Sequence, residues 1–375
     1  MDMSAFPTNY ILIDRNAIAH NVRALKQRVG AHTELIAVVK ANAYGHGAIQ
    51  VAQTALAAGA SRLAVARIAE GVALRQGGIK APILVMGYHL PTEAPTAIAY
   101  GLTVTVNDDH FAQTLAQEAR EAGKRVNIHV KIDTGMSRFG LMPDEVLPFL
   151  ERITCYPYLH LEGLWTHFAT ADEADKTFAW RQFTRYQEVT TIARQRFDIP
   201  MLHVANSAAI LDLPETWLDA VRPGIALYGL YPSNEVDKAL DLRPALSLIS
   251  HVGRVRTLPA GTSVSYGRTF IAEKPFKAAL LPIGYGDGIH RLLSNRGEVL
   301  IHGQRAPIRG RVCMDNIIVD VSHIAGVREG DQAVLLGAQD EDRISAEEMA
   351  AWAETINYEI TTSLLSRTPR IYMGN

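Results

Sequence analysis

Residues 35–47 read LIAVVKANAYGHG. The stretch opens with an apolar, largely β-branched run, and Lys40 follows it directly. Because the run does not alternate with polar residues, it is typical of a strand that is buried on both faces, as in a parallel sheet covered by helices. We therefore predict a buried strand over residues 35–39 with a lysine at its C-terminal end.

Further runs of the same kind extend this pattern along the chain. They cover residues 63–66, 83–86, 103–106, 126–132, 159–165, 201–204 and 220–222. Helical spacing marks residues 49–58, 111–122 and 177–196 between them, and Gly123 suits the position that ends the second helix. Eight strands that mostly alternate with helices favour an α/β fold, a (β/α)8 TIM-like barrel. The span of these strands also fits the usual size of such a barrel, ~250 residues. An open, doubly wound sheet is the alternative.

The pattern changes in the last third of the chain. Pro232 and Pro244 flank a polar connector, after which short alternating runs are separated by turn residues. These runs cover residues 246–255, 276–282, 298–301, 306–312, 317–321 and 332–336. Alternation with closely spaced turns predicts a mainly antiparallel β domain.

A late helix is predicted over residues 345–354, where Ser345 and Glu348 have the spacing of a capping box. We expect two domains. The first is the barrel, over residues 10–242, and the second is the β-strand-rich C-terminal domain, over residues 243–375.

Composition and charge exclude several classes of protein. The 375 residues are 48% apolar and 20% charged, as in a globular chain with a sizeable core. The net charge is 37 − 39 = −2, which argues against nucleic acid as a partner because a phosphate backbone calls for a basic face. Cys155 and Cys313 lack zinc-site spacing and make no disulfide framework, so we expect no metal. Residues 1–14 lack the features of a signal peptide, and no apolar stretch is long enough for a membrane span, so we expect a cytoplasmic protein without a membrane partner.

Polar residues gather at the predicted C-terminal ends of the barrel strands, where the active residues of parallel barrels collect. They are Lys40, Lys131, Asp133, His167, Asn206, Ser207 and Arg222. A single lysine or histidine at a strand end is usually only solvated or paired. Because all of these residues converge on one face, we predict an active site there.

Two of these features point to one cofactor. A lysine after a buried strand is poorly hydrated, which lowers its pKa and leaves an amine able to form a Schiff base with an aldehyde. Ser207 and the backbone around Gly224 and Ile225 follow the seventh and eighth strands, the usual phosphate site of such barrels. A lysine for an aldehyde across from a phosphate site indicates pyridoxal phosphate (PLP).

The sequence around Lys40 resembles the PLP-attachment motif of the bacterial alanine racemases, which are PLP-dependent enzymes of fold-type III. Further motifs match that family in the same order, from near residue 10 to the C-terminus. They are KIDTGMSRFG (131–140), THFATAD (166–172), RPGIALYG (222–229), SYG (265–267), GYGDG (284–288), RVCMD (311–315) and NYE (357–359). The resemblance implies a barrel followed by a β domain, with a first strand near residues 10–14 that packs on the β domain.

The same resemblance implies a function. We expect an isomerase, EC 5.1.1.1, that interconverts L-alanine and D-alanine and supplies D-alanine for peptidoglycan. Racemisation needs a base on each face of a planar carbanion, because one base removes the Cα proton and the other returns a proton from the opposite side. By resemblance, Lys40 holds PLP and is one base. Tyr266 is the other base, contributed by the second subunit of a homodimer whose active sites are shared.

Further roles follow from the resemblance. His167 and Arg222 resemble a network beside the phenolic base, and Arg222 resembles the partner of the PLP ring nitrogen, to which a guanidinium can only donate. Arg138 and the backbone amide of Met314 are expected to hold the substrate carboxylate. The remaining residues match the phosphate-binding set (Tyr44, Ser207, Gly224, Ile225 and Tyr358) and the lining of the access corridor (Asp172, Tyr285, Arg291 and Arg311).

Lys131 matches a lysine that is often carbamylated in this family. A carbamate would turn its positive charge negative and let it pair with Arg138. The alternative is an unmodified Lys131 that faces Asp133.

Other functions compete with this interpretation. A broad-specificity amino-acid racemase on the same scaffold is the main alternative, since Gly286 and residues 67–71 depart mildly from the family pattern and leave the substrate preference open. A basic-amino-acid decarboxylase would carry an acidic residue at the position of Arg222. A PLP carrier protein would lack the residues beyond 240, and a sugar- or protein-binding module is supported only by the β domain.

Overall fold

The computed structural model describes residues 7–374. Residues 1–6, which belong to the stretch on which the expected lack of a signal peptide rests, lie outside the described residues. The chain divides into two compact units. Of the described residues, the barrel unit comprises 17–43 and 47–244, and the β unit comprises 7–16, 44–46 and 245–374.

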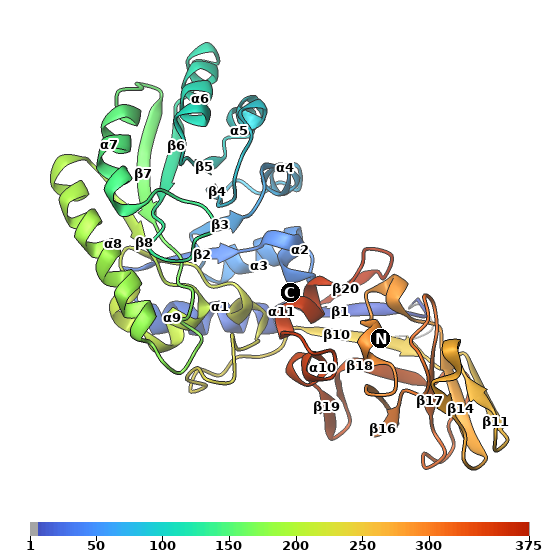
Figure 1. The fold of residues 1–375 in the computed structure, drawn as a ribbon. Coiled ribbons are helices and arrows are strands. Elements are labelled where there is room, and N and C mark those ends of the chain that lie inside the picture. Colours follow the sequence, from blue (N-terminus) through green and yellow to red (C-terminus); the bar gives the residue numbers. More distant parts are fainter. Residues whose placement is uncertain (1–6, 375) are drawn as a thin grey trace. The chain divides into compact units, whose positions relative to one another are not determined.

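Parallel strands form the sheet of the barrel unit (Figure 1). They are β2 (Glu34–Val38), β3 (Arg62–Val65), β4 (Ile83–Val85), β5 (Thr103–Thr105), β6 (Val126–Lys131), β7 (Leu159–Trp165), β8 (Met201–His203) and β9 (Ala220–Val221), in the order β8-β7-β6-β5-β4-β3-β2-β9. Backbone hydrogen bonds join the two ends of this row, from the Arg222 N–H to the Ala205 oxygen (2.9 Å) and from the Asp219 N–H to the Leu202 oxygen (3.2 Å). The sheet therefore closes, which confirms the predicted (β/α)8 barrel and excludes the open sheet.

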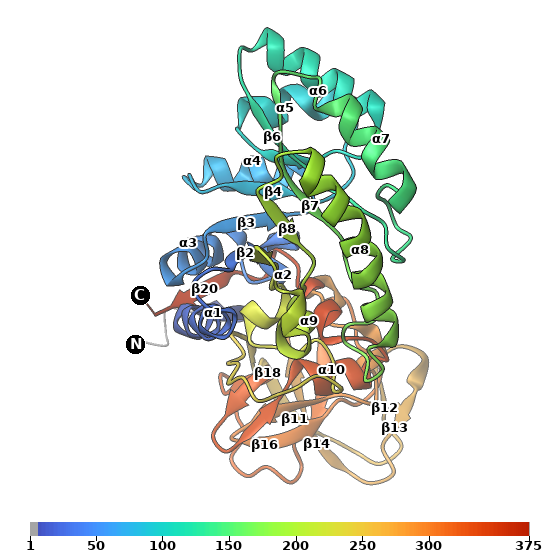
Figure 2. The same cartoon turned by 90° about the vertical axis from the view of Figure 1, so that its left-hand side faces the viewer.

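Burial explains why these strands lack alternation. Every residue of β4 and β5 is buried, because the barrel interior covers one face and helices cover the other. The helices are α1 (Arg15–Val29), α3 (Ala48–Ala58), α4 (Ile68–Gln76), α5 (Ala94–Ala99), α6 (Asp109–Glu121), α7 (Pro143–Ile153), α8 (Thr177–Arg196) and α9 (Ser207–Asp212), with 3-10 turns η2 (Pro91–Glu93), η3 (Pro214–Thr216) and η4 (Ile225–Tyr228). Figure 1 and Figure 2 show α4 to α8 on the outer side of the strands.

The ends of the predicted helices are set by local chemistry. The helix predicted over residues 177–196 is confirmed at both ends as α8. Helix α6 begins where the Asp108 carboxylate accepts a hydrogen bond from the Phe111 N–H (2.7 Å). Just beyond its end, Gly123 has a φ of 62°, the left-handed conformation that terminates helices and that glycine adopts most easily.

The β unit is mainly antiparallel, as predicted. Its strands are β1 (Tyr10–Asp14), β10 (Leu246–His251), β11 (Arg254–Leu258), β12 (Ser263–Val264), β13 (Phe270–Ile271), β14 (Phe276–Leu281), β15 (Glu298–Ile301), β16 (Gln304–Pro307), β17 (Ile317–Asp320), β18 (Gln332–Gln339), β19 (Asp342–Ile344) and β20 (Arg370–Met373). The largest sheet has the order β16-β15-β18-β10-β1-β20, with β19 paired to β18, and β11-β14-β17 form a second sheet. The first strand of the chain, β1, pairs antiparallel with β10 and parallel with β20.

Helices α10 (Ala346–Trp352) and α11 (Asn357–Thr362) and 3-10 turns η5 (Tyr266–Arg268), η6 (Tyr285–Asp287) and η7 (Arg291–Leu293) complete this unit. The Ser345 hydroxyl caps α10 by accepting from the Glu348 N–H (3.1 Å). The Glu348 carboxylate pairs with Arg305 instead (2.5 Å), so only half of the predicted capping box forms.

Two strand predictions in the β unit are wrong in extent. The run over residues 246–255 is split between β10 and β11, because the Val252 N–H bonds to Asp331 beside one sheet and the Gly253 N–H bonds to Leu280 in another. The run over residues 306–312 contributes only to the end of β16. The Ile308 and Arg309 N–H groups still bond to the backbone of Gly297 and of Ile318 in β17, but those of Gly310 and Val312 bond to the side chains of Asn295 and Ser294 instead of a strand.

The described residues contain neither a candidate membrane span nor a candidate metal site. No helix among them is long and apolar enough to cross a membrane. No group of three or more His, Cys, Asp or Glu side chains among residues 7–374 is placed to hold a metal ion.

Candidate active site

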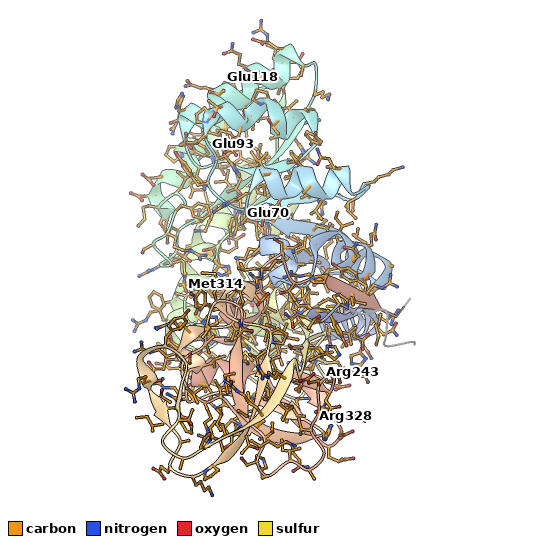
Figure 3. All side chains as sticks on the ribbon, turned by 90° about the vertical axis from the view of Figure 1, so that its right-hand side faces the viewer. Glu70, Glu93, Glu118, Arg243, Met314 and Arg328 are labelled. Atoms are coloured by element: carbon orange, nitrogen blue, oxygen red, sulfur yellow. The ribbon has the colours of Figure 1, made fainter. Side chains whose placement is uncertain are left out.

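Lys40 follows β2 at the C-terminal end of the barrel strands. It opens α2 (Lys40–Tyr44), a left-handed turn in which φ lies between 51° and 54° at the three central residues. Left-handed backbone costs roughly 1–2 kcal/mol per residue for residues other than glycine. The carboxylate of Glu70 in α4, labelled in Figure 3, accepts a hydrogen bond from the Ala41 N–H (2.6 Å) and helps to hold this turn.

Positively charged side chains gather at this end of the barrel. We define the cation cluster as Lys40, Lys131, Arg138 and Arg222. None of them makes an ion pair with a carboxylate of the residues that the structure describes. The cluster therefore carries a local excess of positive charge, which suits an anionic occupant.

Burial lowers the pKa values of Lys40, Lys131 and Arg222, and repulsion from neighbouring cations adds to the effect at the two lysines. Burial, and next the charge of Arg138, lower the pKa of the Lys40 amine, while Glu70 opposes the shift. Burial lowers the pKa of Lys131 to about 8 and that of Arg222 to about 10. Neutral amine is therefore more accessible at Lys40 and Lys131 than at an ordinary lysine, and a neutral amine is the form that acts as nucleophile or base.

His167 follows β7 and lies among the same charges. Burial, followed by the positive charges of the whole cation cluster, holds its pKa well below the usual value. Its Nδ1 atom is 3.5 Å from Nη2 of Arg222. The imidazole is therefore neutral at physiological pH.

The Arg222 guanidinium is held by acceptors on three sides. Nη1 donates to Nδ1 and to the backbone oxygen of His203, both at 2.8 Å. Nη2 donates to the backbone oxygens of Thr166 (2.6 Å) and Val204 (3.0 Å). These bonds use all the Nη hydrogens, and the Nε–H has no acceptor among residues 7–374. The Nε–H is thus free to donate to a ligand.

A second polar feature lies at the ends of β8 and β9. The Ser207 oxygen accepts hydrogen bonds from the N–H groups of Gly224 (2.8 Å) and Ala226 (3.3 Å), which leaves its hydroxyl hydrogen to donate outward. The N–H of Ile225, at the start of η4, has no acceptor within the described part of the chain. Donors that converge from one turn in this way suit a phosphate.

Lys131 is fully buried at the end of β6. Its amine donates to the backbone oxygen of Phe139 and lies 4.3 Å from the ring centroid of Phe139 and 5.6 Å from that of Trp165. The Asp133 carboxylate accepts instead from two backbone amides of its own loop. The indole N–H of Trp165 is buried without an acceptor among the described residues.

Tyr266 lies in the β unit, at the first position of η5, and its side chain is 71% exposed. The residue before it, Ser265, has φ 62° and ψ −173°, a region that is occupied almost only by glycine. The Ser265 hydroxyl donates to the backbone oxygen of Arg311 (2.6 Å) and lies 3.1 Å from the sulfur of Cys313. These contacts hold the strained backbone that presents the tyrosine to solvent.

Met314 lies on the loop before β17 and is 53% exposed; Figure 3 labels it. Its backbone oxygen accepts from the Gly286 N–H (2.8 Å). Next to it, Asp315 pairs with Arg367 (2.7 Å), which also pairs with the buried Asp287 (2.7 Å). These contacts fix the loop on both sides of Met314. The Met314 N–H has no acceptor among the residues described, so it can donate to a ligand oxygen.

Tyr44 and Tyr358 also belong to the β unit, and their ring centroids are 6.2 Å apart. Burial raises the pKa of Tyr44, so its phenol stays protonated and can donate. Gly45 follows with a φ of 85°, and a Cβ there would lie 2.0 Å from the Thr361 oxygen. Only glycine fits this close approach to α11.

The expected access-corridor residues are distributed between the units. Arg291 and Arg311 line one hollow of about 260 Å³ in the β unit. Tyr285 opens η6 in the same unit and is 40% exposed. Asp172 belongs to the barrel unit.

Sequence reasoning missed one feature of the barrel unit. Three strands carry a buried chain of polar side chains, formed by His129, Glu162 and His203. A histidine and a glutamate inside otherwise apolar strand sequences were the available signal. The runs that contain them predict only buried strands.

Comparisons with known proteins agree on one family. The model of the alanine racemase N-terminal domain matches residues 13–232, and that of the alanine racemase C-terminal domain matches residues 245–372. A relative named alanine racemase from Desulforamulus reducens is 47% identical over 365 residues, which are 96% of this chain and 98% of the relative.

Solved structures extend the comparison to the fold. Alanine racemase from Clostridium difficile 630 has a TM-score of 0.94 at 37% identity, with 99% of this chain and 97% of that chain covered. A histidine racemase from Leuconostoc mesenteroides subsp. sake has a TM-score of 0.90 at 27% identity, with 99% of both chains covered. Because the two family models together match most of the sequence, the chain belongs to the alanine racemase family.

Proposed function

We propose that the chain binds PLP at the mouth of its barrel and interconverts L-alanine and D-alanine by a two-base proton transfer. The reaction makes it an isomerase that supplies D-alanine for peptidoglycan. The observation that carries the proposal is the cation cluster, in which the pKa of Lys40 is lowered and no member makes an ion pair with a carboxylate of the described residues. A phosphorylated cofactor and a substrate carboxylate supply the missing negative charge.

The residues of the barrel unit fit PLP in three respects. The Lys40 amine suits the aldehyde, and Ser207 with the Gly224–Ile225 turn suits the phosphate. From the family resemblance we further propose Tyr44 and Tyr358, which belong to the β unit, as phosphate ligands. The free Nε–H of Arg222 suits an unprotonated ring nitrogen, since a guanidinium can donate but not accept. When bound, PLP holds the substrate nitrogen and draws electron density from Cα, which acidifies the Cα proton.

The protein supplies the bases and the binding groups. Lys40 is one base, and its lowered pKa keeps part of the amine neutral. Tyr266 is the base on the opposite face. Arg138 and the free Met314 N–H hold the substrate carboxylate, so the Cα proton points at one base or the other.

A second copy of the chain completes the site in this proposal. Exposed apolar side chains of the β unit include Tyr266, Ile271, Tyr285, Leu292, Met314 and Ile356. Large exposed apolar side chains on the unit that carries the proposed tyrosine base support a surface that is buried against another subunit. We propose a cytoplasmic homodimer in which each barrel receives Tyr266 and Met314 from its partner, while Arg291, Arg311, Tyr285 and Asp172 line the path of the substrate.

A broad-specificity racemase remains the second candidate function. The fold is shared with a histidine racemase, so the fold alone does not select alanine. Racemisation rates with lysine, arginine, serine and histidine beside alanine separate the two candidates. Comparable rates with the larger substrates would favour the second.

The direct test of function is proton exchange. Incubation of the PLP-loaded protein with L-alanine in D₂O should give loss of optical rotation together with deuterium at Cα, followed by polarimetry and mass spectrometry. Lys40→Ala and Tyr266→Phe each remove one base, so racemisation should fall by at least the roughly 100-fold of a lost acid–base group. A control, Tyr88→Phe, changes another exposed tyrosine of the chain and should keep full activity. No racemisation by the PLP-loaded, unsubstituted protein would reject the proposal.

Arg222 should also control the fidelity of the reaction. A donor-only partner would leave the ring nitrogen of the cofactor unprotonated and would limit how far the ring stabilises negative charge at Cα. Arg222→Glu should therefore increase half-transamination, measured as pyruvate formed from alanine, whereas Arg222→Lys retains donation and should not. An unchanged pyruvate yield in the glutamate variant would refute this role.

We also propose that Lys131 is carbamylated. Its amine is buried, and a carbamate would accept from the unpaired Trp165 N–H and pair with Arg138. Only a neutral amine reacts with CO₂, so with a pKa of about 8 the reactive fraction rises as the pH increases through that value. Carbon-13 NMR with labelled bicarbonate should show a carbamate signal that grows over this range. The Lys131→Gln variant must lack the signal, and its absence from the unsubstituted protein would contradict the proposal.

A further inference from the structure

The interior of the barrel unit contains a continuous chain of polar side chains. Such interiors are normally filled by layers of branched apolar residues. Here His129 in β6, Glu162 in β7 and His203 in β8 are all buried. Nδ1 of His129 is 2.8 Å from Nε2 of His203, and Nε2 of His129 is 3.0 Å from the Glu162 carboxylate.

Each end of this chain has a fixed hydrogen-bonding role. At one end, Nη1 of Arg222 lies 2.8 Å from Nδ1 of His203, and a guanidinium can only donate. At the other end, the Glu162 carboxylate takes a further bond from Arg62 (2.8 Å). Burial raises the pKa of Glu162, but the bonds from His129 and Arg62 outweigh this and lower it to about 2, so the carboxylate is ionised and can only accept.

These fixed ends determine both histidine tautomers. His203 must accept at Nδ1 and therefore carries its proton on Nε2, which donates to Nδ1 of His129. His129 in turn carries its proton on Nε2, which donates to Glu162. Any other neutral tautomer places two donors or two acceptors face to face inside the barrel, where an unsatisfied polar group is destabilising.

Both imidazoles are also kept neutral. Burial is the largest cause that lowers the pKa of each, and the positive charges of Arg222 and Arg62 add to it, while Glu162 opposes the shift at His129. A protonated His203 could not accept from Arg222. The orientation of the guanidinium therefore depends on a carboxylate that it does not touch.

We propose that Glu162 and His129 are positioning residues that fix the tautomer of His203 and so hold Arg222 with its Nε–H directed to the ring nitrogen of the cofactor. The proposal rests on the function proposed above for its last step only. The chain of donors, the two tautomers and the four acceptors of the Nη hydrogens are properties of the protein itself. Trp165 supports the arrangement, since its ring stacks on His203 and lies 5.0 Å from the Arg222 guanidinium.

The chain offers a matched control for Glu162. Glu34 also pairs with Arg62 at 2.8 Å, but its carboxylate is 39% exposed and bonds to neither histidine among the described residues. Glu162→Gln and Glu34→Gln thus remove the same charge from the same arginine. Only the first change gives His129 a partner that can donate as well as accept.

The first readout is the tautomer state, which does not depend on activity. In the full-length, cofactor-loaded protein labelled with nitrogen-15 histidine, NMR should show both His129 and His203 with the proton on Nε2. Glu34→Gln should leave these signals in place, whereas Glu162→Gln should shift them or split them into two populations. An Nδ1–H tautomer at either histidine in the unsubstituted protein would overturn the proposal, even if Glu162→Gln fails to fold.

The second readout is kinetic. Glu162→Gln should lower kcat on the order of tenfold, as for lost outer-shell partners of catalytic ligands, with little change in KM. It should also raise the amount of pyruvate formed per racemisation event. Glu34→Gln should change neither kcat nor the pyruvate yield. We call the hydrogen-bonded chain from Glu162 through His129 and His203 to Arg222 the relay. In a His203→Gln background the relay is already broken, so Glu162→Gln should add no further loss of kcat.

The outcomes separate this proposal from the proposed function. If the unsubstituted protein does not racemise alanine but shows the Nε2–H tautomers, the function fails and the relay stands. If it racemises alanine and Glu162→Gln matches Glu34→Gln in tautomers and kcat, the relay fails and the function stands. If Glu162→Gln lowers kcat by the same factor in the unsubstituted protein and in the His203→Gln variant, Glu162 has only a structural role and the relay is also overturned.

Discussion

The barrel mouth holds positive charges that form no ion pair with a carboxylate of the described residues. In an ordinary protein surface such a cluster would be solvated, but here two of its members are buried and a third is half-buried. Poor hydration, followed by repulsion between the cations, explains the lowered pKa values of Lys40 and Lys131 and the neutral state of His167. The same excess charge accounts for the chemistry of the occupant, since a phosphate, a carboxylate and a carbamate each remove part of it.

Strained backbone adjoins both proposed bases. A left-handed turn follows Lys40, and Ser265, in a conformation suited to glycine, precedes Tyr266. Strain of this kind persists only where surrounding contacts hold it, and it is concentrated at functional sites. Here the contacts are specific, from the Glu70 carboxylate in the barrel unit and from the Arg311 oxygen in the β unit. Each base therefore leaves its loop in a direction set by the backbone rather than by side-chain rotation alone.

Much of the fold could be predicted from the sequence, for a physical reason. Strands buried on both faces need uninterrupted apolar runs, so all eight barrel strands were visible, and α8 was located at both ends. The β unit was less predictable. Strand β20 is short and half-buried, and it exists because it pairs with β1 from the other end of the chain. The division of residues 246–255 likewise depends on which sheet each amide reaches. The polar chain through His129 and Glu162 could not be predicted because it is formed by contacts between side chains of three different strands.

The central claim is that one chain carries every catalytic group but that a complete site needs two chains. Subunit mixing tests this most directly. Lys40→Ala and Tyr266→Phe proteins, each inactive alone, are dissociated, mixed and reassociated, and racemisation is compared with unsubstituted protein treated in the same way. A mixed dimer has one site with both defects and one site with both bases, so random reassociation should restore on the order of a quarter of the activity. No recovery, although differently tagged subunits co-purify as mixed dimers, would contradict the account.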